Sequence, residues 1–348
     1  MANNGSVAVV LLQLGGPDSL AAVEPFLYNL FSDPDIIEFP FARLTRPLMA
    51  RLIASRRAGK VAEHYARIGG KSPLGEFTER QAKALEDVLR QHIDARVFVA
   101  MRYWHPSVEE ALQAVISGGF RRVVLLPLYP QYSKTTTGSS LNEWQRNSAR
   151  QQPPLPSLVI REFYDHPLYL DALVERVNQG LARFKESGGT LNRGSPGDTR
   201  SVWLIFSAHG LPVSVIEAGD PYQAQVEATV KLVMKKGGWP NPHVLCYQSR
   251  VSPGQWLQPS LHSTLERLAA DGSEEVLIIP VSFVSDHVET LYEIDIEARE
   301  HATRAGIRQF ELMPGLNTSP TFIRSLTSLV LQGVKSGAES ADPAAETG

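Results

Sequence analysis

The chain has 348 residues, of which 43% are hydrophobic and 20% charged, and a formal net charge of −3. This balance is typical of a globular protein and gives no reason to expect nucleic acid as a partner. The length exceeds what one hydrophobic core usually fills, about 250–300 residues, so we expect two domains.

The single cysteine, Cys246, excludes a disulfide within the chain and an iron–sulfur cluster held by this chain alone. A cytosolic protein is the simplest interpretation. The N-terminus has an apolar run of only Val7–Leu12 with no basic segment before it, so we expect a buried strand there rather than a signal peptide. The sequence contains no stretch of about 18 apolar residues, so we expect no membrane-spanning helix.

Short runs rich in Val, Ile and Leu alternate with helical patterns. The runs predict strands at 7–14, 96–103, 122–130, 157–163, 201–208, 243–249, 275–283 and 311–317. The helical patterns cover 20–31, 75–92, 107–117, 167–185, 221–237, 258–270 and 319–335. Uninterrupted apolar runs are typical of strands buried on both faces of a parallel sheet, and their alternation with helices indicates β-α-β units.

The strand and helix pattern occurs twice, which predicts an α/β fold with a boundary near residue 165. We expect an N-terminal domain over 1–165, a C-terminal domain over 166–335 and a disordered tail over 336–348. The polar, glycine-rich segment 186–201 is expected to be a surface loop.

Ligands of open α/β sheets bind beyond the carboxyl ends of the strands, so the strand exits matter most. The first exit, "LGGPDS" (14–19), permits a tight turn but carries neither G-x-G-x-x-G nor a P-loop. His209 lies at another exit, in "SAHGLP". A lone histidine is more often structural than catalytic, but this one stands where small and polar residues replace apolar ones, and it can exchange a proton near neutral pH.

An acidic stripe follows the strand at 275–283. On a helical wheel its five carboxylates fall within an arc of about 80°; they are Asp286, Glu289, Glu293, Glu297 and Glu300. No Lys or Arg stands four residues after Glu289, Glu293 or Glu297, so we expect the acids to lack basic partners, and like charges at this spacing cost about 0.2–0.5 kcal/mol per pair. The helix dipole explains acids in the first turn only. The stripe is therefore either a solvated acidic face or a surface that handles cations.

His287 stands two residues before Glu289, and a regular α-helix would point the two side chains about 160° apart. For both to face one cavity, the turn must be irregular or widened toward a π-helix, a feature common at functional sites. Histidine with carboxylates suits Fe²⁺, Zn²⁺ or Mn²⁺. The sequence has no H-E-x-x-H motif, so the pattern favours a metal that passes through over one that stays.

Two basic segments have open interpretations. The run 56–74 places Arg and Lys near Tyr65, which suits a flat apolar ligand that carries carboxylates, or is a solvated face. The segment 39–53 mixes apolar residues with three arginines, which suits a membrane surface or a packed lid; its members are Phe39, Phe41, Arg43, Leu44, Arg46, Leu48, Met49, Arg51 and Leu52.

The sequence resembles the ferrochelatase family, of the bacterial type, from about residue 7 to 335. The motifs occur in the family's order: "LGGPDS", "YARIGGKSPL", "RYWHP", "YPQYS...TTGSSLN", "FSAHGLP", "GDPY", "YQSRV" and "SDHVETLYEID". The resemblance implies two Rossmann-like domains, each a parallel sheet flanked by helices, with an active-site cleft between them. It implies an enzyme, a lyase that inserts Fe²⁺ into protoporphyrin IX to give protohaem, with release of two protons, in the last step of haem synthesis.

The resemblance also implies roles for single residues. The implied catalytic residues are His209, Glu289 and His287. His209 would take pyrrole protons, bind the metal or do both, with Glu289 as its carboxylate partner and His287 beside that carboxylate. The implied metal ligands are His209, Glu289, Glu293 and Glu297. The implied porphyrin-binding residues are Leu14, Arg57, Tyr65, Ser72, Arg102, Tyr103, Ser249 and Trp256.

The chain departs from the family's animal members, which hold a [2Fe–2S] cluster with cysteines. The "YPQYS" loop here continues with Lys134 and the C-terminal region has no cysteine, so we expect no cluster and no other cofactor, Fe²⁺ being a substrate. The segment "VSPGQW" also differs from the family's usual "VGPMPW"-like form.

Two other functions stay open at this point. The chain could be a porphyrin or haem carrier without turnover, although a carrier needs no carboxylate stripe. It could also be a cobalt chelatase for a sirohydrochlorin-type ring, which would need more arginines at the lip. The expected partners are protoporphyrin IX and Fe²⁺, the expected location is the cytoplasm, and peripheral attachment to the inner membrane is a further hypothesis.

Overall fold

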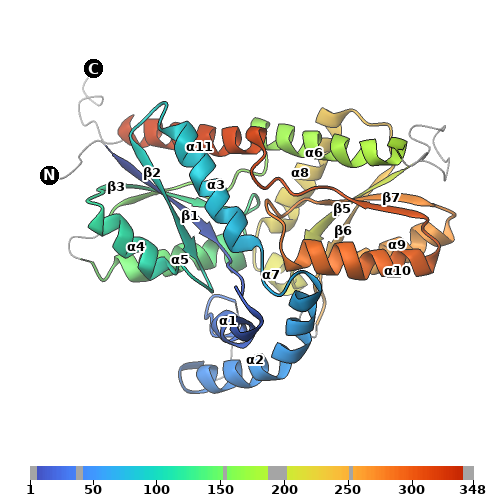
Figure 1. The fold of residues 1–348 in the computed structure, drawn as a ribbon, viewed down its shortest axis with the longest axis horizontal. Helices are drawn as coiled ribbons and strands as arrows, with labels where there is room; N and C mark the ends of the chain where they lie inside the picture. The colour runs from blue at the N-terminus through green and yellow to red at the C-terminus, as the bar shows by residue number, and fades with distance from the viewer. Residues whose placement is uncertain (1–5, 37–41, 152–154, 187–201, 251–253, 340–348) are drawn as a thin grey trace. The chain divides into compact units, whose positions relative to one another are not determined.

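The computed structural model describes residues 6–36, 42–151, 155–186, 202–250 and 254–339 (Figure 1). The chain divides into two compact units. The first comprises Met1–Ala66, Gly70–Phe163 and Thr318–Gly348, and the second comprises Arg67–Gly69 and Tyr164–Asn317.

The first unit is built on a four-stranded parallel sheet. Its strands are β1 (Val7–Gln13), β2 (Ala95–Met101), β3 (Arg122–Pro127) and β4 (Ser157–Val159), in the order β2-β1-β3-β4. Every residue of β1 is buried, as expected of a central strand covered on both faces. The apolar runs of the sequence therefore correspond to strands in the middle of this unit.

Helices cover both faces of the first sheet. The helical elements are η1 (Leu20–Ala22), α1 (Val23–Phe31), α2 (Ala42–Arg67), α3 (Leu74–Leu89), α4 (Val108–Ser117), η2 (Lys134–Gly138), α5 (Ser139–Ser148) and α11 (Pro320–Glu339). In Figure 1, α4 and α5 lie on one face of the sheet and α3 and α11 on the other. Ser107 caps α4 in a capping box with Glu110, which fixes where that helix begins.

The second unit repeats this plan. Its strands are β5 (Trp203–His209), β6 (His243–Gln248), β7 (Glu275–Pro280) and β8 (Gln309–Leu312), in the parallel order β6-β5-β7-β8. Its helices are α6 (Pro167–Glu186), α7 (Val213–Glu217), α8 (Tyr222–Gly237), α9 (Leu261–Ala270), η3 (Glu289–Ala298) and α10 (Arg299–Ala305). The apolar faces of α9 and α10 pack on β5 and β7 in one buried core.

The structure confirms an α/β fold with two parallel sheets flanked by helices, but it changes some boundaries. The run at 157–163 forms only a three-residue strand, and the last strand is β8 rather than 311–317. Helix α11 contacts α3, β3 and β4, so it belongs to the first unit and does not close the second domain as expected. An amphipathic helix packs wherever its apolar face is covered, which sequence order does not dictate.

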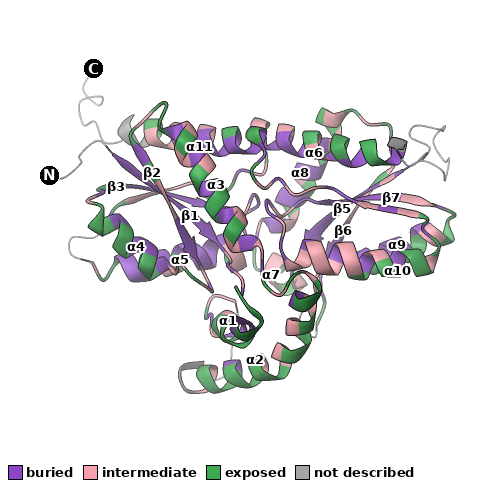
Figure 2. Cartoon of the chain, in the orientation of Figure 1, coloured by how far each residue is buried: buried purple, intermediate pink, exposed green. Residues whose placement is uncertain are grey.

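Two expected irregular segments are only partly described. Residues 336–339 continue α11 as helix, which corrects the expected start of the tail. The rest of the tail, 340–348, and most of the expected loop, 187–201, lie outside the described residues. Burial follows the layers: in Figure 2 the central strands are buried, whereas α2 is largely exposed.

Candidate active site

The site is centred on His209, the last residue of β5. Its side chain is 32% exposed, whereas the strand residues before it are almost all buried. The imidazole Nδ1 lies 2.8 Å from Oε2 of Glu289, the first residue of η3. The structure thus brings together the two residues on which the sequence-based hypothesis depends, although they are far apart in the chain.

Element η3 is a π-helix, as the His287–Glu289 spacing predicted. His287 lies in the irregular segment just before this helix, with Nε2 at 3.8 Å from Oε1 of the Glu289 carboxylate. The Nδ1 of His287 is 3.1 Å from the Ser285 carbonyl, an acceptor, so Nδ1 carries the hydrogen. The carboxylate of Glu289 therefore stands between two imidazoles.

The charges of this group depend on one another. Burial opposes ionisation of Glu289, but the charge and hydrogen bond of His209, helped by His287, hold the pKa of the carboxyl well below its usual range. Burial also opposes protonation of His209, but Glu289 outweighs it and raises the pKa of the imidazole above its ordinary value. The pair is thus a stronger base than an isolated histidine and keeps its carboxylate ionised.

Ser249 joins Glu289 to the next acid of the stripe. Its hydroxyl contacts Oε2 of Glu289 at 3.0 Å and forms a second hydrogen bond with Oε2 of Glu293. The backbone of Ser249 has φ of 66°, a conformation that residues other than glycine rarely adopt. Burial and the neighbouring Glu289 charge raise the pKa of Glu293 to about 7. Glu293 therefore exchanges a proton near neutral pH. The Ser249 hydroxyl was expected to contact the porphyrin, but in the structure it contacts two carboxylates.

The remaining acids of the stripe differ in their surroundings. Glu297 is exposed, whereas Asp286 accepts a hydrogen bond from Asn317 Nδ2 at 2.8 Å. Glu300 pairs with Arg67 at 2.6 Å, so the expectation that the glutamates lack a basic partner is wrong at this position. The partner was missed because it comes from the end of α2 and not from the same helix. Within the described ranges, no three His, Cys, Asp or Glu side chains converge as a metal site would require.

The other residue expected at the porphyrin from the second unit is Trp256. It is 7% exposed and pairs with Pro212 through an isolated β-bridge. A Cβ on Gly210 would lie 3.4 Å from the Trp256 ring, so the ring lies beside the residue that follows His209.

Three residues expected at the porphyrin from the first unit lie near the end of β1. A Cβ on Gly16 would come within 2.5 Å of the Ser72 hydroxyl and 3.9 Å of the Tyr65 hydroxyl, so only glycine fits there. Leu14 precedes this turn and is partly exposed, and its carbonyl accepts a bond from the Tyr103 N–H at 3.0 Å. The structure therefore gathers these side chains at one strand exit.

Arg102 and Tyr103 are held by a buried carboxylate that sequence reasoning missed. Asp33 accepts hydrogen bonds from the Tyr103 and Ser139 hydroxyls, each at 2.5 Å, and pairs with Arg102 at 2.9 Å. Burial opposes the charge of Asp33, but these donors and Arg102 lower the pKa of its carboxyl. The sequence "SDPD" around Asp33 looks like an ordinary turn and carries no signal of this role.

Two further residues contact the main chain of His209 and were not singled out, Tyr222 and Ser282. Tyr222 belongs to the "GDPY" motif, which marked the family but suggested no role. Arg57, expected at the porphyrin, lies over the Phe31 ring at 5.5 Å.

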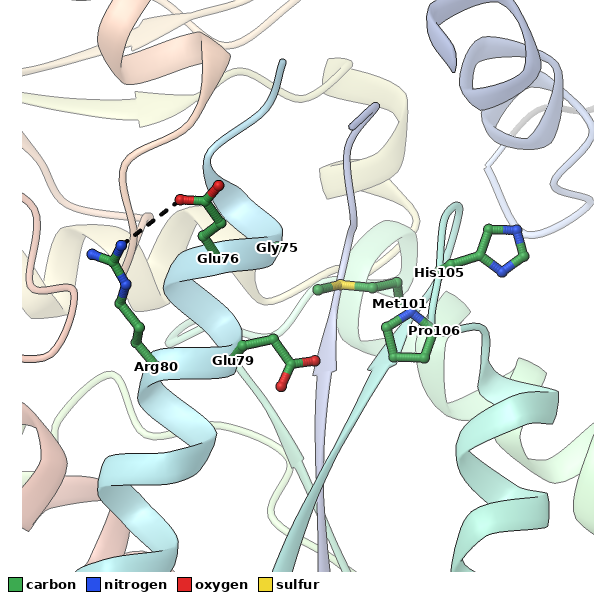
Figure 3. Close-up of a pocket in the computed structure, with 7 residues that line it drawn as sticks. All are labelled: Gly75, Glu76, Glu79, Arg80, Met101, His105 and Pro106. Atoms are coloured by element: carbon green, nitrogen blue, oxygen red, sulfur yellow. Dashed lines mark ion pairs between the residues drawn. The ribbon is translucent and has the colours of Figure 1, made fainter. Parts of the chain in front are cut away.

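A separate pocket of about 480 Å³ lies in the first unit between the start of α3 and the end of β2 (Figure 3). Figure 3 shows Glu76 and Arg80 of α3 as an ion pair on one side and Met101 and Pro106 on the other. None of the residues expected at the site lines this pocket. We therefore assign it no part in the chemistry.

Comparison with known proteins agrees with the geometry. The model of the family described as Ferrochelatase matches residues 6–334. A ferrochelatase of Geotalea daltonii is 50% identical over 323 residues, covering 93% of this chain and 96% of the relative. A ferrochelatase of Synechocystis is 46% identical over 336 residues, covering 95% and 83%.

Solved structures of low sequence identity share the fold. SirB from Bacillus subtilis with Fe³⁺ aligns with a TM-score of 0.54 at 11% identity, covering 97% of this chain and 99% of that one. CbiX, described as the terminal enzyme for biosynthesis of sirohaem in denitrifying bacteria, aligns with a TM-score of 0.50 at 11% identity, covering 93% and 98%. The family model and the relatives together show that this chain belongs to the ferrochelatase family.

Proposed function

We infer that this protein is a ferrochelatase, which inserts Fe²⁺ into protoporphyrin IX and releases two protons in haem biosynthesis. The observation that carries the mechanism is the 2.8 Å contact between His209 Nδ1 and Glu289 Oε2 at the end of β5. Membership of the family supplies the reaction, and this contact supplies a group that can perform its proton transfer.

The hydrogen-bond direction assigns the reactive nitrogen. Because Nδ1 of His209 donates to the Glu289 carboxylate, Nε2 is the nitrogen that keeps a lone pair in the neutral ring. We propose that Nε2 removes pyrrole protons or binds the incoming iron, and that Glu289 stabilises the imidazolium that forms. Insertion also requires a bent macrocycle with exposed nitrogen lone pairs, a strain that binding of the porphyrin's periphery can offset.

The acids that follow Glu289 extend away from it toward solvent. Glu293, whose pKa is about 7, is partly buried, and Glu297 is exposed. Carboxylates with this gradient of exposure can exchange water ligands of Fe²⁺ in steps and can return protons to solvent. We propose that Glu293 and Glu297 handle iron, protons or both.

We propose that the porphyrin's periphery contacts the first unit through Leu14, Arg57, Tyr65 and Ser72. Arg102 and Tyr103 contribute differently, since Asp33 already engages both side chains. They would fix the shape of that surface more than they would bind a propionate. We expect no iron–sulfur cluster, and this stays a prediction.

The test is anaerobic mixing of purified protein with Fe²⁺ and protoporphyrin IX, followed by loss of porphyrin fluorescence and appearance of haem absorbance. Repeated turnover is expected, and His209→Ala should abolish it without changing the unfolding temperature. Stoichiometric binding without metalation would instead indicate a carrier. A parallel reaction with Co²⁺ and sirohydrochlorin tests the remaining alternative, and preference for that pair would overturn the proposal.

Protoporphyrin dissolves in membranes, so we also propose peripheral contact with a lipid surface. Among the helices in the described part of the chain, none has the length and hydropathy needed to cross a bilayer. Helix α2 instead exposes Leu48, Leu52 and Met49, which are 71%, 41% and 37% exposed, beside the exposed Arg51. Apolar side chains beside basic ones suit an anionic membrane surface.

Co-sedimentation with phosphatidylglycerol vesicles tests this contact. Binding should be lost in the double variant Leu48→Gln, Leu52→Gln and kept in Ile116→Gln, which changes an apolar residue of α4 that is 37% exposed. Equal binding by both variants would argue for a packed lid. Phe39 and Phe41 were also predicted to belong to this surface, but they lie outside the described residues.

A further inference from the structure

The main chain of His209 is held by strand pairing on one side and by side chains of other elements on the other. On one side β6 pairs with β5 as far as His209. On the other side the pairing with β7 stops at Ser207. Beyond that point Ser282 Oγ accepts the His209 N–H at 3.1 Å, and Tyr222 Oη donates to the His209 carbonyl at 3.0 Å. Side chains thus replace the sheet bonds that the strand has lost.

The two hydroxyls satisfy both polar groups of the His209 main chain. The His209 N–H donates to Ser282, and the Tyr222 hydroxyl donates to the His209 carbonyl. Each bond uses a different side chain, so loss of either hydroxyl leaves one main-chain group of His209 without its partner.

Tyr222 is itself fixed by the start of α8. It is 6% exposed, and its N–H donates to Oδ1 of Asp220 at 3.0 Å. Burial raises the pKa of the Tyr222 phenol above its ordinary value, so the hydroxyl keeps its hydrogen throughout the neutral range. The "GDPY" turn therefore delivers a permanent donor to the carbonyl of His209.

We propose that Tyr222 and Ser282 are positioning residues that hold the His209 main chain where its Nδ1 meets Glu289 and its Nε2 keeps one direction; this role rests on the proposed function. With the main chain and Nδ1 both fixed, the imidazole has no free torsion with which to turn Nε2 aside. Small displacements of a reacting group cost large factors, up to about 10²-fold for 1 Å. These two hydrogen bonds are thus part of what makes the histidine an effective base.

The contact between His209 Nδ1 and Glu289 gives a readout independent of turnover. If Tyr222→Phe loosens the main chain, this 2.8 Å contact lengthens and the Nδ1–H hydrogen exchanges with water more rapidly. Nuclear magnetic resonance of ¹⁵N-labelled histidine detects that hydrogen, with His209→Ala assigning the signal.

The main experiment compares Tyr222→Phe with Tyr169→Phe. Tyr169 is a matched control, because its buried hydroxyl also donates to a main-chain carbonyl, that of Val281, at 3.0 Å. Both variants should lose similar stability. Only Tyr222→Phe should lower kcat, by about tenfold with KM within about twofold, and speed the exchange of the His209 Nδ1–H hydrogen. If Tyr222→Phe fails to fold, Ser282→Ala serves in its place, with Ser282→Thr expected to restore activity because it keeps the hydroxyl.

Three outcomes would overturn the proposal. They are an unchanged kcat, a kcat loss with an unchanged Nδ1–H signal, and equal losses of kcat in Tyr222→Phe and Tyr169→Phe. The measurement of the Nδ1–H hydrogen needs neither iron nor porphyrin. If the wild-type protein inserts no iron, the proposed function fails, whereas an unchanged Nδ1–H signal in Tyr222→Phe would by itself defeat the positioning claim.

Discussion

The ends of β1 and β5 occupy the same place in two sheets of the same strand order, yet they carry different chemistry. In each unit, the residue after the third strand donates an N–H bond to the central strand, to Leu12 in the first unit and to Ser207 in the second. Counting two residues on gives Leu14 in the first unit and His209 in the second. One scaffold position therefore holds an apolar side chain in one unit and the proposed base in the other.

The neighbouring strands, β2 and β6, show the same relation. The N–H of Met101 and that of Tyr247 each donate to a proline carbonyl beyond the strand, so the residue two further on is Tyr103 in the first unit and Ser249 in the second. Tyr103 bonds to the buried Asp33, whereas Ser249 bonds to carboxylates of the acidic stripe. The first unit neutralises its charge internally, while the second keeps groups that titrate near neutral pH.

The third strand of each unit leads to a π-helix. The one in the first unit, η2, begins with Lys134, and η3 begins with Glu289. A π-turn is thus not sufficient for the chemistry. The side chain at the start of each π-helix decides what chemistry the unit can perform. Single substitutions in the two units can test this comparison.

The largest difference is expected between Glu289→Gln and Lys134→Gln, since each removes the charge at the start of one π-helix. Loss of Glu289 should lower kcat by about 10²–10⁴-fold, because His209 loses both its orienting partner and its raised pKa. Lys134→Gln should stay within about twofold. Steady-state haem formation measures both, and similar losses would mean that the two π-helices contribute alike.

The pH profile gives the sign of this effect. His209 must be neutral to accept a proton, so wild-type activity should rise with pH through a value above about 6.5. In Glu289→Gln burial, which favours the neutral ring, is opposed only by the weaker influence of Glu293, so the rise should move to lower pH while the plateau falls. If the pH–activity profile of Glu289→Gln keeps the wild-type midpoint, Glu289 does not influence the group that titrates.

The next largest effect should come from the buried charge of the first unit. Asp33→Asn removes the nearest carboxylate of Arg102, which is 10% exposed and keeps the longer contacts with Glu143 at 3.7 Å and Asp35 at 4.0 Å, and should cost about 3 kcal/mol of unfolding free energy. Because the folded pKa of Asp33 is lowered, its stabilisation is present above about 3.8 and is lost as pH falls through the folded pKa. Urea unfolding at several pH values measures both.

Asp87→Asn is the control for that experiment. Asp87 pairs with Lys83 on the surface of α3, where the two side chains are 53% and 68% exposed. Its removal should change stability by less than about 1 kcal/mol. If the two variants lose equal stability, the Asp33 network does not hold the first unit together.

The features predicted from sequence are those that local pattern determines. Apolar runs located the strands because parallel strands are buried on both faces, and the conflict between His287 and Glu289 predicted the π-turn because the angle between neighbours on a helix is fixed. His209 was found because a polar residue at a strand exit breaks an apolar run. The resemblance then supplied its partner.

What escaped prediction joins distant parts of the chain. Arg67 and Glu300 are 233 residues apart, so no helical spacing links them. Asp33 is 70 residues from Tyr103, and a turn-forming aspartate looks the same whether it faces solvent or a buried arginine. The resemblance placed Ser249 at the porphyrin, but its hydroxyl contacts the acids instead. The sequence does not reveal the left-handed backbone of Ser249, so this contact could not be predicted.

A moderate effect is expected from Ser249, the link between the two acids. In Ser249→Ala the hydrogen bond that lowers the pKa of Glu293 is lost, so that pKa should rise above about 7 and kcat should fall about tenfold near neutral pH. Ser249→Gly also lacks the hydroxyl but accepts φ of 66° without strain. Equal activity losses in both would assign the effect to the hydroxyl, whereas recovery in the glycine variant would assign it to the backbone.

The smallest effect is expected at the far end of the stripe, where Glu300 differs from the acids that precede it. Glu300 and Arg67 are 53% and 48% exposed and form a surface ion pair, which also lowers the pKa of Glu300 and keeps it charged. Glu300→Gln should therefore change stability little and leave kcat within about twofold. Glu293→Gln should lower kcat and flatten its pH dependence near 7, because its carboxyl titrates there. Parallel pH–rate profiles of the two variants decide whether the acidic stripe works as one line of carboxylates. A loss in Glu300→Gln as large as that in Glu293→Gln would extend the functional stripe to the Arg67 pair, whereas a loss confined to Glu293 would end it before Glu300.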